Sequence, residues 1–114
     1  MPLTDETFTA LAQNVDLVIN STSVGMAPLD GQCPWTETVP MPSKTIYYDL
    51  VYNPRETVFL NRAREAGAAA VSGIGMLVNQ GALSFKIWTG KNAPIEIMKQ
   101  VCIQAQQRVI IHKL

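Results

Sequence analysis

The stretch that decides the predicted fold of this chain is Thr45-Ile46-Tyr47-Tyr48-Asp49-Leu50-Val51-Tyr52-Asn53-Pro54. From Thr45 to Tyr52 it is rich in β-branched and aromatic side chains, which favour an extended strand. Asn53 can cap a helix, Pro54 suits the first helical position, and Glu56 has the spacing of a capping box. The stretch therefore predicts a strand that passes directly into a helix.

The predicted helix has apolar side chains at helical spacing on one face: Phe59, Leu60, Ala63 and Ala66. Gly67 follows them, and glycine commonly ends a helix because it adopts the left-handed conformation easily. We therefore expect the helix to stop there and to bury the face that carries Phe59 and Leu60.

Two further strands are predicted, one before this unit in the sequence and one after it. Residues 15–20 are mostly apolar β-formers that end in polar residues, a pattern typical of a buried parallel strand. Residues 68–71 give a weaker strand signal. Between the first two strands, residues 27–43 hold Pro28, Pro34, Pro40 and Pro42, so an irregular loop is expected there.

Three more helices complete the pattern. Thr4 can cap a short helix near the start of the chain, and another is predicted over residues 76–88. A last one begins at Pro94, with an apolar stripe formed by Ile95, Met98, Val101, Cys102, Ala105 and Val109. Trp35 and Trp88 are interpreted as packing anchors.

This order of elements predicts an α/β fold, the second half of a Rossmann-like parallel sheet of about three strands with C-terminal helices. Parallel strands bring their carboxyl ends to one edge of the sheet. Ligands bind at that edge in open α/β sheets, so we expect the functional residues to follow the strands.

Composition disfavours several classes of partner. The formal net charge is zero, without the basic stripe that nucleic acids require or the polybasic cluster that binds anionic lipid. Cys33 and Cys102 are too few for a disulfide framework or a zinc site and are expected to be free thiols. The first residues lack the pattern of a signal peptide, so a cytoplasmic protein is predicted, with neither nucleic acid nor membrane as a partner.

Three separated motifs lie at the predicted strand ends. They are Asn20-Ser21-Thr22-Ser23-Val24-Gly25-Met26, Tyr48-Asp49-Leu50-Val51-Tyr52-Asn53-Pro54 and Gly73-Ile74-Gly75-Met76-Leu77-Val78-Asn79-Gln80. The last is no dinucleotide turn, because Val78 occupies the position of the third glycine in G-x-G-x-x-G. In this order and spacing the motifs strongly resemble the C-terminal half of shikimate dehydrogenases, from about residue 15 to residue 90.

The resemblance implies a role for particular residues. It implies that NADP is contacted by Thr22, Ser23, Val24, Leu50, Gly73 and Met76. It also implies that Tyr52 and Gln80 contact the substrate, 3-dehydroshikimate or shikimate. Asp49 is expected to be structural, bonding backbone near its turn.

The family's catalytic lysine–aspartate pair and glycine-rich phosphate turn belong to segments that precede this region. No catalytic residue and no metal ligand is therefore assigned here. Residues 1–114 are interpreted as a partial NADP-binding, Rossmann-like domain of an enzyme of aromatic amino-acid biosynthesis, expected to be inactive alone.

Two alternatives remain open. The chain could be a non-catalytic α/β association module, or a relative that uses quinate or NAD. A strand over residues 15–20 would present an unpaired outer edge, and the last helix an uncovered apolar stripe. Such surfaces favour association, so a homo-oligomer through the sheet edge or the C-terminal helix is predicted.

Overall fold

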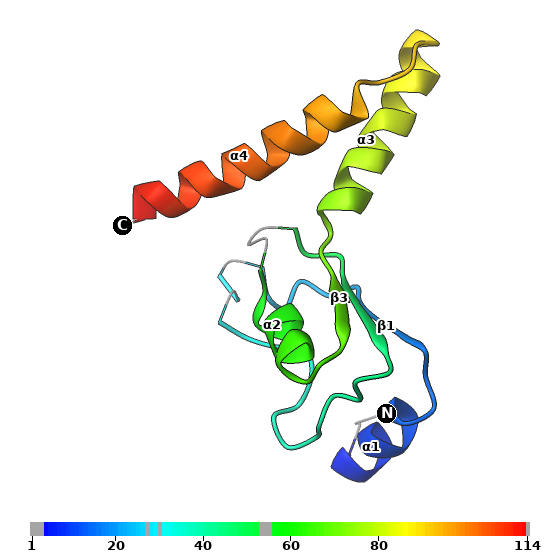
Figure 1. The fold of residues 1–114 in the computed structure, drawn as a ribbon, viewed down its shortest axis with the longest axis vertical. Helices are drawn as coiled ribbons and strands as arrows, with labels where there is room; N and C mark the ends of the chain where they lie inside the picture. The colour runs from blue at the N-terminus through cyan, green and yellow to red at the C-terminus, as the bar shows by residue number, and fades with distance from the viewer. Residues whose placement is uncertain (1–3, 27, 30, 53–55, 114) are drawn as a thin grey trace. The chain divides into compact units, whose positions relative to one another are not determined.

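The computed structural model describes residues 4–26, 28, 29, 31–52 and 56–113, with side chains up to residue 105. The chain consists of two compact units, Met1–Ser72 and Gly73–Leu114. The first holds a sheet and two helices, and the second holds two longer helices (Figure 1). The predicted α/β class is confirmed.

The sheet of the first unit has three parallel strands in the order β1-β2-β3. They are β1 (Leu17–Asn20), β2 (Ile46–Asp49) and β3 (Ala69–Val71). β2 lies in the centre, with Asn20 of β1 opposite Asp49. The predicted number and direction of strands are therefore confirmed, and the carboxyl ends of β1 and β2 lie side by side.

The prediction that β1 is a fully buried strand is wrong. Leu17 and Ile19 are each 51% exposed, and of the four strand residues only Asn20 is buried. Ile46 and Val71, which lie on the same face of the sheet as Leu17 and Ile19, are also exposed. The apolar run suits a strand covered on both faces, whereas the core of this unit covers only the face of Tyr47.

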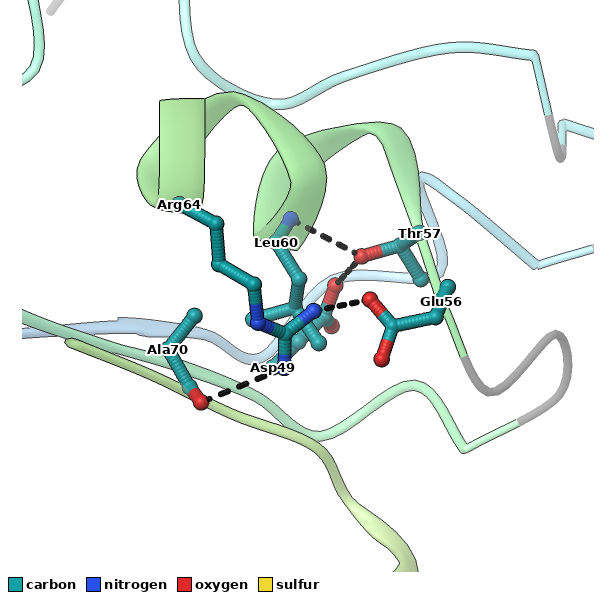
Figure 2. Close-up of polar contacts among 6 residues, drawn as sticks. All are labelled: Asp49, Glu56, Thr57, Leu60, Arg64 and Ala70. Atoms are coloured by element: carbon teal, nitrogen blue, oxygen red, sulfur yellow. Dashed lines mark hydrogen bonds and ion pairs between the residues drawn. The ribbon is translucent and has the colours of Figure 1, made fainter. Parts of the chain in front are cut away.

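Helix α2 (Val58–Glu65) begins later than predicted. Its N-cap is Thr57, whose Oγ1 accepts a hydrogen bond of 3.2 Å from the Leu60 amide. The predicted cap Asn53 and first-turn Pro54 lie outside the described residues, and Glu56 pairs with Arg64 instead of closing a capping box (Figure 2). Thr57 acts as the cap because its hydroxyl is also held by a hydrogen bond to the buried carboxylate of Asp49.

The far end of α2 agrees with the sequence, with one exception. Phe59, Leu60 and Ala63 are buried against the sheet as predicted, while Ala66 is exposed and forms the C-cap. Gly67 follows with φ +83°, the left-handed conformation that lets the chain turn back into β3.

An aromatic series runs through the core of the first unit. Phe8, Trp35, Tyr47 and Phe59 pack edge to face in succession, with ring centroids 4.5, 5.6 and 5.8 Å apart. The indole N–H of Trp35 donates to the Val39 carbonyl at 2.9 Å, which confirms Trp35 as a packing anchor. The proline-rich loop therefore covers the core although, over residues 31–43, it forms only turns and bends.

Tyr47 is the central aromatic residue and is fully buried. Its hydroxyl donates to the Pro42 carbonyl at 2.9 Å. Burial raises the pKa of the Tyr47 phenol above its usual value, since the phenolate would lose its hydration. Tyr47 thus joins strand β2 to the loop in its neutral form.

The short helix α1 (Asp5–Ala12) is capped as predicted, with the Thr7 amide donating to Thr4 Oγ1 at 3.2 Å. In the second unit, α3 (Ile74–Thr89) ends at Gly90, whose φ is +72°. Helix α4 (Ile95–Lys113) approaches α3 where an added Cβ on Gly81 would lie 3.4 Å from Met98 Cε.

The prediction of Trp88 as a packing anchor is wrong, since it is 82% exposed. On α4, Met98 and Cys102 are half-buried while Ile95 and Val101 are exposed. The side chain of Val109, the last member of the predicted stripe, lies outside the described residues. Among the helices in the described part of the chain, none is long and apolar enough to cross a membrane.

Candidate functional site

The first set of predicted site residues gathers at the carboxyl edge of the sheet. Thr22, Ser23 and Val24 follow β1, and Leu50 and Tyr52 follow β2. Because the two strands are paired in parallel, the two loops start next to each other. The Leu50 amide donates to the Asn20 carbonyl at 3.1 Å and so extends the pairing beyond the last strand residue.

The loop after β1 presents polar groups at the surface. Ser21, Thr22 and Ser23 are exposed. The hydroxyl of Thr22 is held within the loop, since it donates to Asn20 Oδ1 at 2.6 Å and accepts from the Val24 amide at 3.1 Å. Thr22 therefore shapes the turn, and the exposed hydroxyl of Ser23 is better suited to contact ribose or phosphate oxygens.

A cavity of about 170 Å³ lies beneath this loop. Its polar lining comes from Asn20, Ser21 and Thr22, and the rest from apolar side chains. These apolar residues are Phe8, Val18, Ile19, Pro34, Trp35 and Phe59. The strand end thus combines hydroxyl and amide groups with an apolar recess.

Asp49 anchors the loop after β2 from below. Its side chain is fully buried, and Oδ1 accepts from the Val51 amide at 2.9 Å. Oδ2 accepts from the Thr57 hydroxyl at 2.7 Å, which in turn accepts from Leu60 (Figure 2). The prediction that Asp49 bonds backbone near its turn is confirmed.

Asn20 belongs to the same buried network, which the sequence did not reveal. Its Nδ2 donates to Asp49 Oδ1 at 3.1 Å and to the Val24 carbonyl at 2.9 Å. Its Oδ1 accepts from the Thr22 amide at 3.1 Å and from the Thr22 hydroxyl. The only sequence signal is a polar residue at the end of each of two apolar strands.

The second set of predicted site residues lies at the start of α3. Gly73 is buried and serves as the N-cap without any side-chain bond, while Met76 is 36% exposed and Gln80 is exposed one turn later. The first amides of a helix have no partner within it, so this end can offer N–H groups to a ligand. An added Cβ on Gly75 would meet no atom within 4 Å, so its backbone is open to close approach.

Acid–base groups are scarce among the predicted residues of both sets. They offer hydroxyl, amide and backbone groups together with apolar surface, but no lysine, histidine or carboxylate. Among the described residues no cluster of His, Cys, Asp or Glu could hold a metal ion. This chemistry suits binding and orientation of ligands, and the phenol of Tyr52 is the single ionisable side chain among these predicted residues.

The chain has the features of Rossmann-like α/β proteins. These features are the parallel sheet, the exposed loops at the strand ends and a helix, α3, that begins after a glycine. Residues 73–103 match the family model of the shikimate 5'-dehydrogenase C-terminal domain. Over 92 residues the chain is 45% identical to the shikimate dehydrogenase (NADP(+)) of Methanopyrus kandleri, an alignment that covers 81% of this chain and 32% of that protein.

Solved structures give the same result. A crystal structure of a shikimate dehydrogenase in complex with NADP+ superposes with a TM-score of 0.76 at 41% identity, covering 82% of this chain and 32% of that one. The shikimate 5-dehydrogenase of Listeria monocytogenes, in complex with shikimate and NAD, gives a TM-score of 0.75 at 32% identity, covering 85% and 34%. The chain belongs to the shikimate dehydrogenase family and corresponds to its C-terminal part. It spans about a third of the length of the curated relatives it matches.

Proposed function

We propose that this chain provides part of the cofactor site and part of the substrate pocket of an NADP-dependent shikimate dehydrogenase. The family reaction is the reversible transfer of hydride between NADP and the carbonyl of 3-dehydroshikimate. The observation that carries the proposal is the clustering of four predicted residues at one sheet edge: Thr22, Ser23, Val24 and Leu50. The chain that carries them is similar to a shikimate dehydrogenase solved in complex with NADP+. Residues 1–114 are then a partial NADP-binding domain.

The proposed contacts to the cofactor use exposed hydroxyl and backbone groups. In the first unit these are Ser23, Thr22, Val24 and the backbone of Leu50. In the second unit they are Gly73, with the open backbone of Gly75, and Met76, whose exposed side chain can pack against a ring. Curated relatives are named for NADP(+), which favours NADP over NAD as the cofactor.

The proposed contacts to the substrate use Tyr52 and Gln80. Both side chains are exposed, and both can form hydrogen bonds with hydroxyl or carboxylate groups. A shikimate-like ring carries these groups beside apolar carbon, which matches a phenol and a carboxamide.

The substitution Gly75→Ala tests the cofactor proposal. Alanine is favoured over glycine in a helix, and its Cβ would meet no atom of the protein within 4 Å, so the fold should be kept or slightly stabilised. If the cofactor approaches this backbone, the methyl group should cost about 1–3 kcal/mol of binding, or roughly five- to 150-fold in affinity. Fluorescence or NMR titration with NADP+ measures the effect.

Gly31→Ala is the matched control, because an added Cβ there also meets nothing within 4 Å. It should leave NADP+ affinity unchanged. Equal affinities for wild type and Gly75→Ala would remove the α3 backbone from the proposed cofactor contacts.

The substitutions Tyr52→Phe and Gln80→Ala test the substrate proposal. Each removes a hydrogen bond worth about 0.5–1.5 kcal/mol, so shikimate binding should weaken roughly two- to 13-fold. NADP+ affinity should stay as in wild type. Variants that altered only the response to NADP+ would reverse the assignment of these two residues.

A second candidate function is self-association. β1 is an edge strand of the described sheet, and it carries the exposed side chains Leu17 and Ile19. Helix α4 likewise exposes Ile95, Ile97 and Val101. Unpaired strand edges and apolar stripes are surfaces on which chains associate.

On this candidate, light scattering at micromolar concentration should show a homodimer or a larger assembly. A specific interface would bury more than about 1,000 Å². Ile19→Lys should dissociate an assembly formed through the sheet edge, and Val101→Lys one formed through α4. Gln13→Lys, at an exposed polar position, is the control, and a stable wild-type monomer would refute self-association.

A further inference from the structure

We propose that Asn20 and Asp49 form a cross-strand clamp that positions the two loops proposed to contact the cofactor. The loops are residues 21–25 after β1 and residues 50–52 after β2. The inference rests on the proposed function for its consequence, but the clamp itself is a property of the protein without ligand. Neither buried side chain is assigned a contact with cofactor or substrate.

The carboxamide of Asn20 uses its full hydrogen-bonding capacity. Its nitrogen donates to Asp49 Oδ1 and to the Val24 carbonyl, and its oxygen accepts twice from Thr22. An amide offers two donors and two acceptor positions, so both ends of the group are committed. Aspartate at this position would lack the donors, and leucine would lack both kinds of group, so the geometry requires asparagine.

The carboxylate of Asp49 joins three segments of the chain. It accepts from Asn20 at the end of β1, from the Val51 amide in its own loop, and from Thr57 at the start of α2. A fully buried carboxylate is costly unless hydrogen bonds replace its hydration, and here three donors do so. Loss of Oδ1, which accepts from both Asn20 and Val51, would therefore disturb both loops together.

The register places this network where it can act on the loops. Asn20 and Asp49 are paired across the sheet, and the Leu50 amide bonds to the Asn20 carbonyl at 3.1 Å. Hydrogen bonds in a connected buried network strengthen one another, so a change in one loop is transmitted to the other. The clamp thereby fixes the distance between Ser23 and the Leu50 backbone, on which simultaneous contact with one ligand depends.

Amide hydrogen exchange in the ligand-free chain tests the clamp directly. Asp49→Asn keeps the shape of the side chain but replaces one of its two acceptor oxygens by an NH2 group, which leaves one oxygen for three donors. We expect the amides of Thr22, Val24 and Val51 to exchange about tenfold faster than in wild type. Thr45→Val is the matched control, since Thr45 is buried on the same segment but bonds the Val15 carbonyl at the opposite end of β2.

A second variant, Thr22→Val, tests the clamp if Asp49→Asn does not fold. Thr22 is exposed, so Thr22→Val should fold while removing the hydroxyl that bonds Asn20. The clamp predicts faster exchange at Val51, in the other loop, which a purely local role of Thr22 would not produce. Unchanged exchange at Val51 in Thr22→Val, or exchange in Thr45→Val that matches Asp49→Asn, would overturn the clamp.

Titration with NADP+ then separates the clamp from the proposed function. Asp49→Asn should weaken NADP+ binding about tenfold, against less than about twofold for Thr45→Val. If wild type gives no response to NADP+, the proposed function fails while the exchange data still decide the clamp. If wild type binds and Asp49→Asn binds equally well, the positioning role is wrong.

Discussion

No oxidation of shikimate with NADP+ or NAD+ is expected from the purified 114-residue chain in a steady-state assay. Hydride transfer needs a proton acceptor beside the reacting hydroxyl, and the proposed site residues include no lysine, histidine or carboxylate. Asp49, the carboxylate at the end of β2, is fully buried and bonded to three donors. Absence of general acid–base groups alone commonly costs about 10²–10⁴ in rate.

The assay must exclude dehydrogenase from the expression host. A mock purification from the same host gives the background, and a Tyr52→Phe preparation shows whether any residual rate belongs to this chain. Turnover near that of ordinary dehydrogenases, and sensitive to Tyr52→Phe, would contradict the prediction that this chain is inactive alone.

Phe59→Ala is expected to be the most destabilising of the single substitutions considered. The ring is 2% exposed and packs edge to face on Tyr47 at 5.8 Å, so its removal leaves a cavity at the end of the aromatic series. Buried phenylalanine to alanine substitutions cost about 3–5 kcal/mol, a large part of the stability of a small domain. Urea unfolding followed by circular dichroism gives the free energy of unfolding.

Phe85→Ala is the matched control, since Phe85 lies on α3 and is 38% exposed. It should cost much less than Phe59→Ala. Equal losses for the two variants would contradict the assignment of the core of the first unit to the face of the sheet that carries Tyr47.

Local signals predicted several elements well. The β-branched and aromatic run before Asp49 predicted the central strand, Thr4 predicted the first cap, and Gly67 predicted the end of α2. In each case the deciding interaction lies within a few residues of the chain. The parallel direction of the strands and the gathering of Thr22 and Leu50 at one edge followed from the rules of parallel sheets.

The errors arose where distant contacts decide the outcome. The Asn53-Pro54 pair is a strong local start signal, yet α2 begins at Val58 because Thr57 is bonded to Asp49, eight residues away in sequence. The Asn20–Asp49 pair spans 29 residues and depends on strand register, so no local pattern revealed it. Trp88 and one face of β1 are exposed because no other described part of their own unit packs over them. The hydropathy of a segment does not predict which other segment will pack against it.

The strand ends and the start of α3 are proposed to bind a nicotinamide cofactor and a shikimate-like substrate. Amide chemical shifts of the ¹⁵N-labelled chain, titrated with NADP+ and then with shikimate, test this proposal most directly. NADP+ should shift the signals of six residues: Thr22, Ser23, Val24, Leu50, Gly73 and Met76. Shikimate should then shift those of Tyr52 and Gln80. Shifts confined to other residues, or none in a chain whose spectrum shows a folded protein, would contradict it.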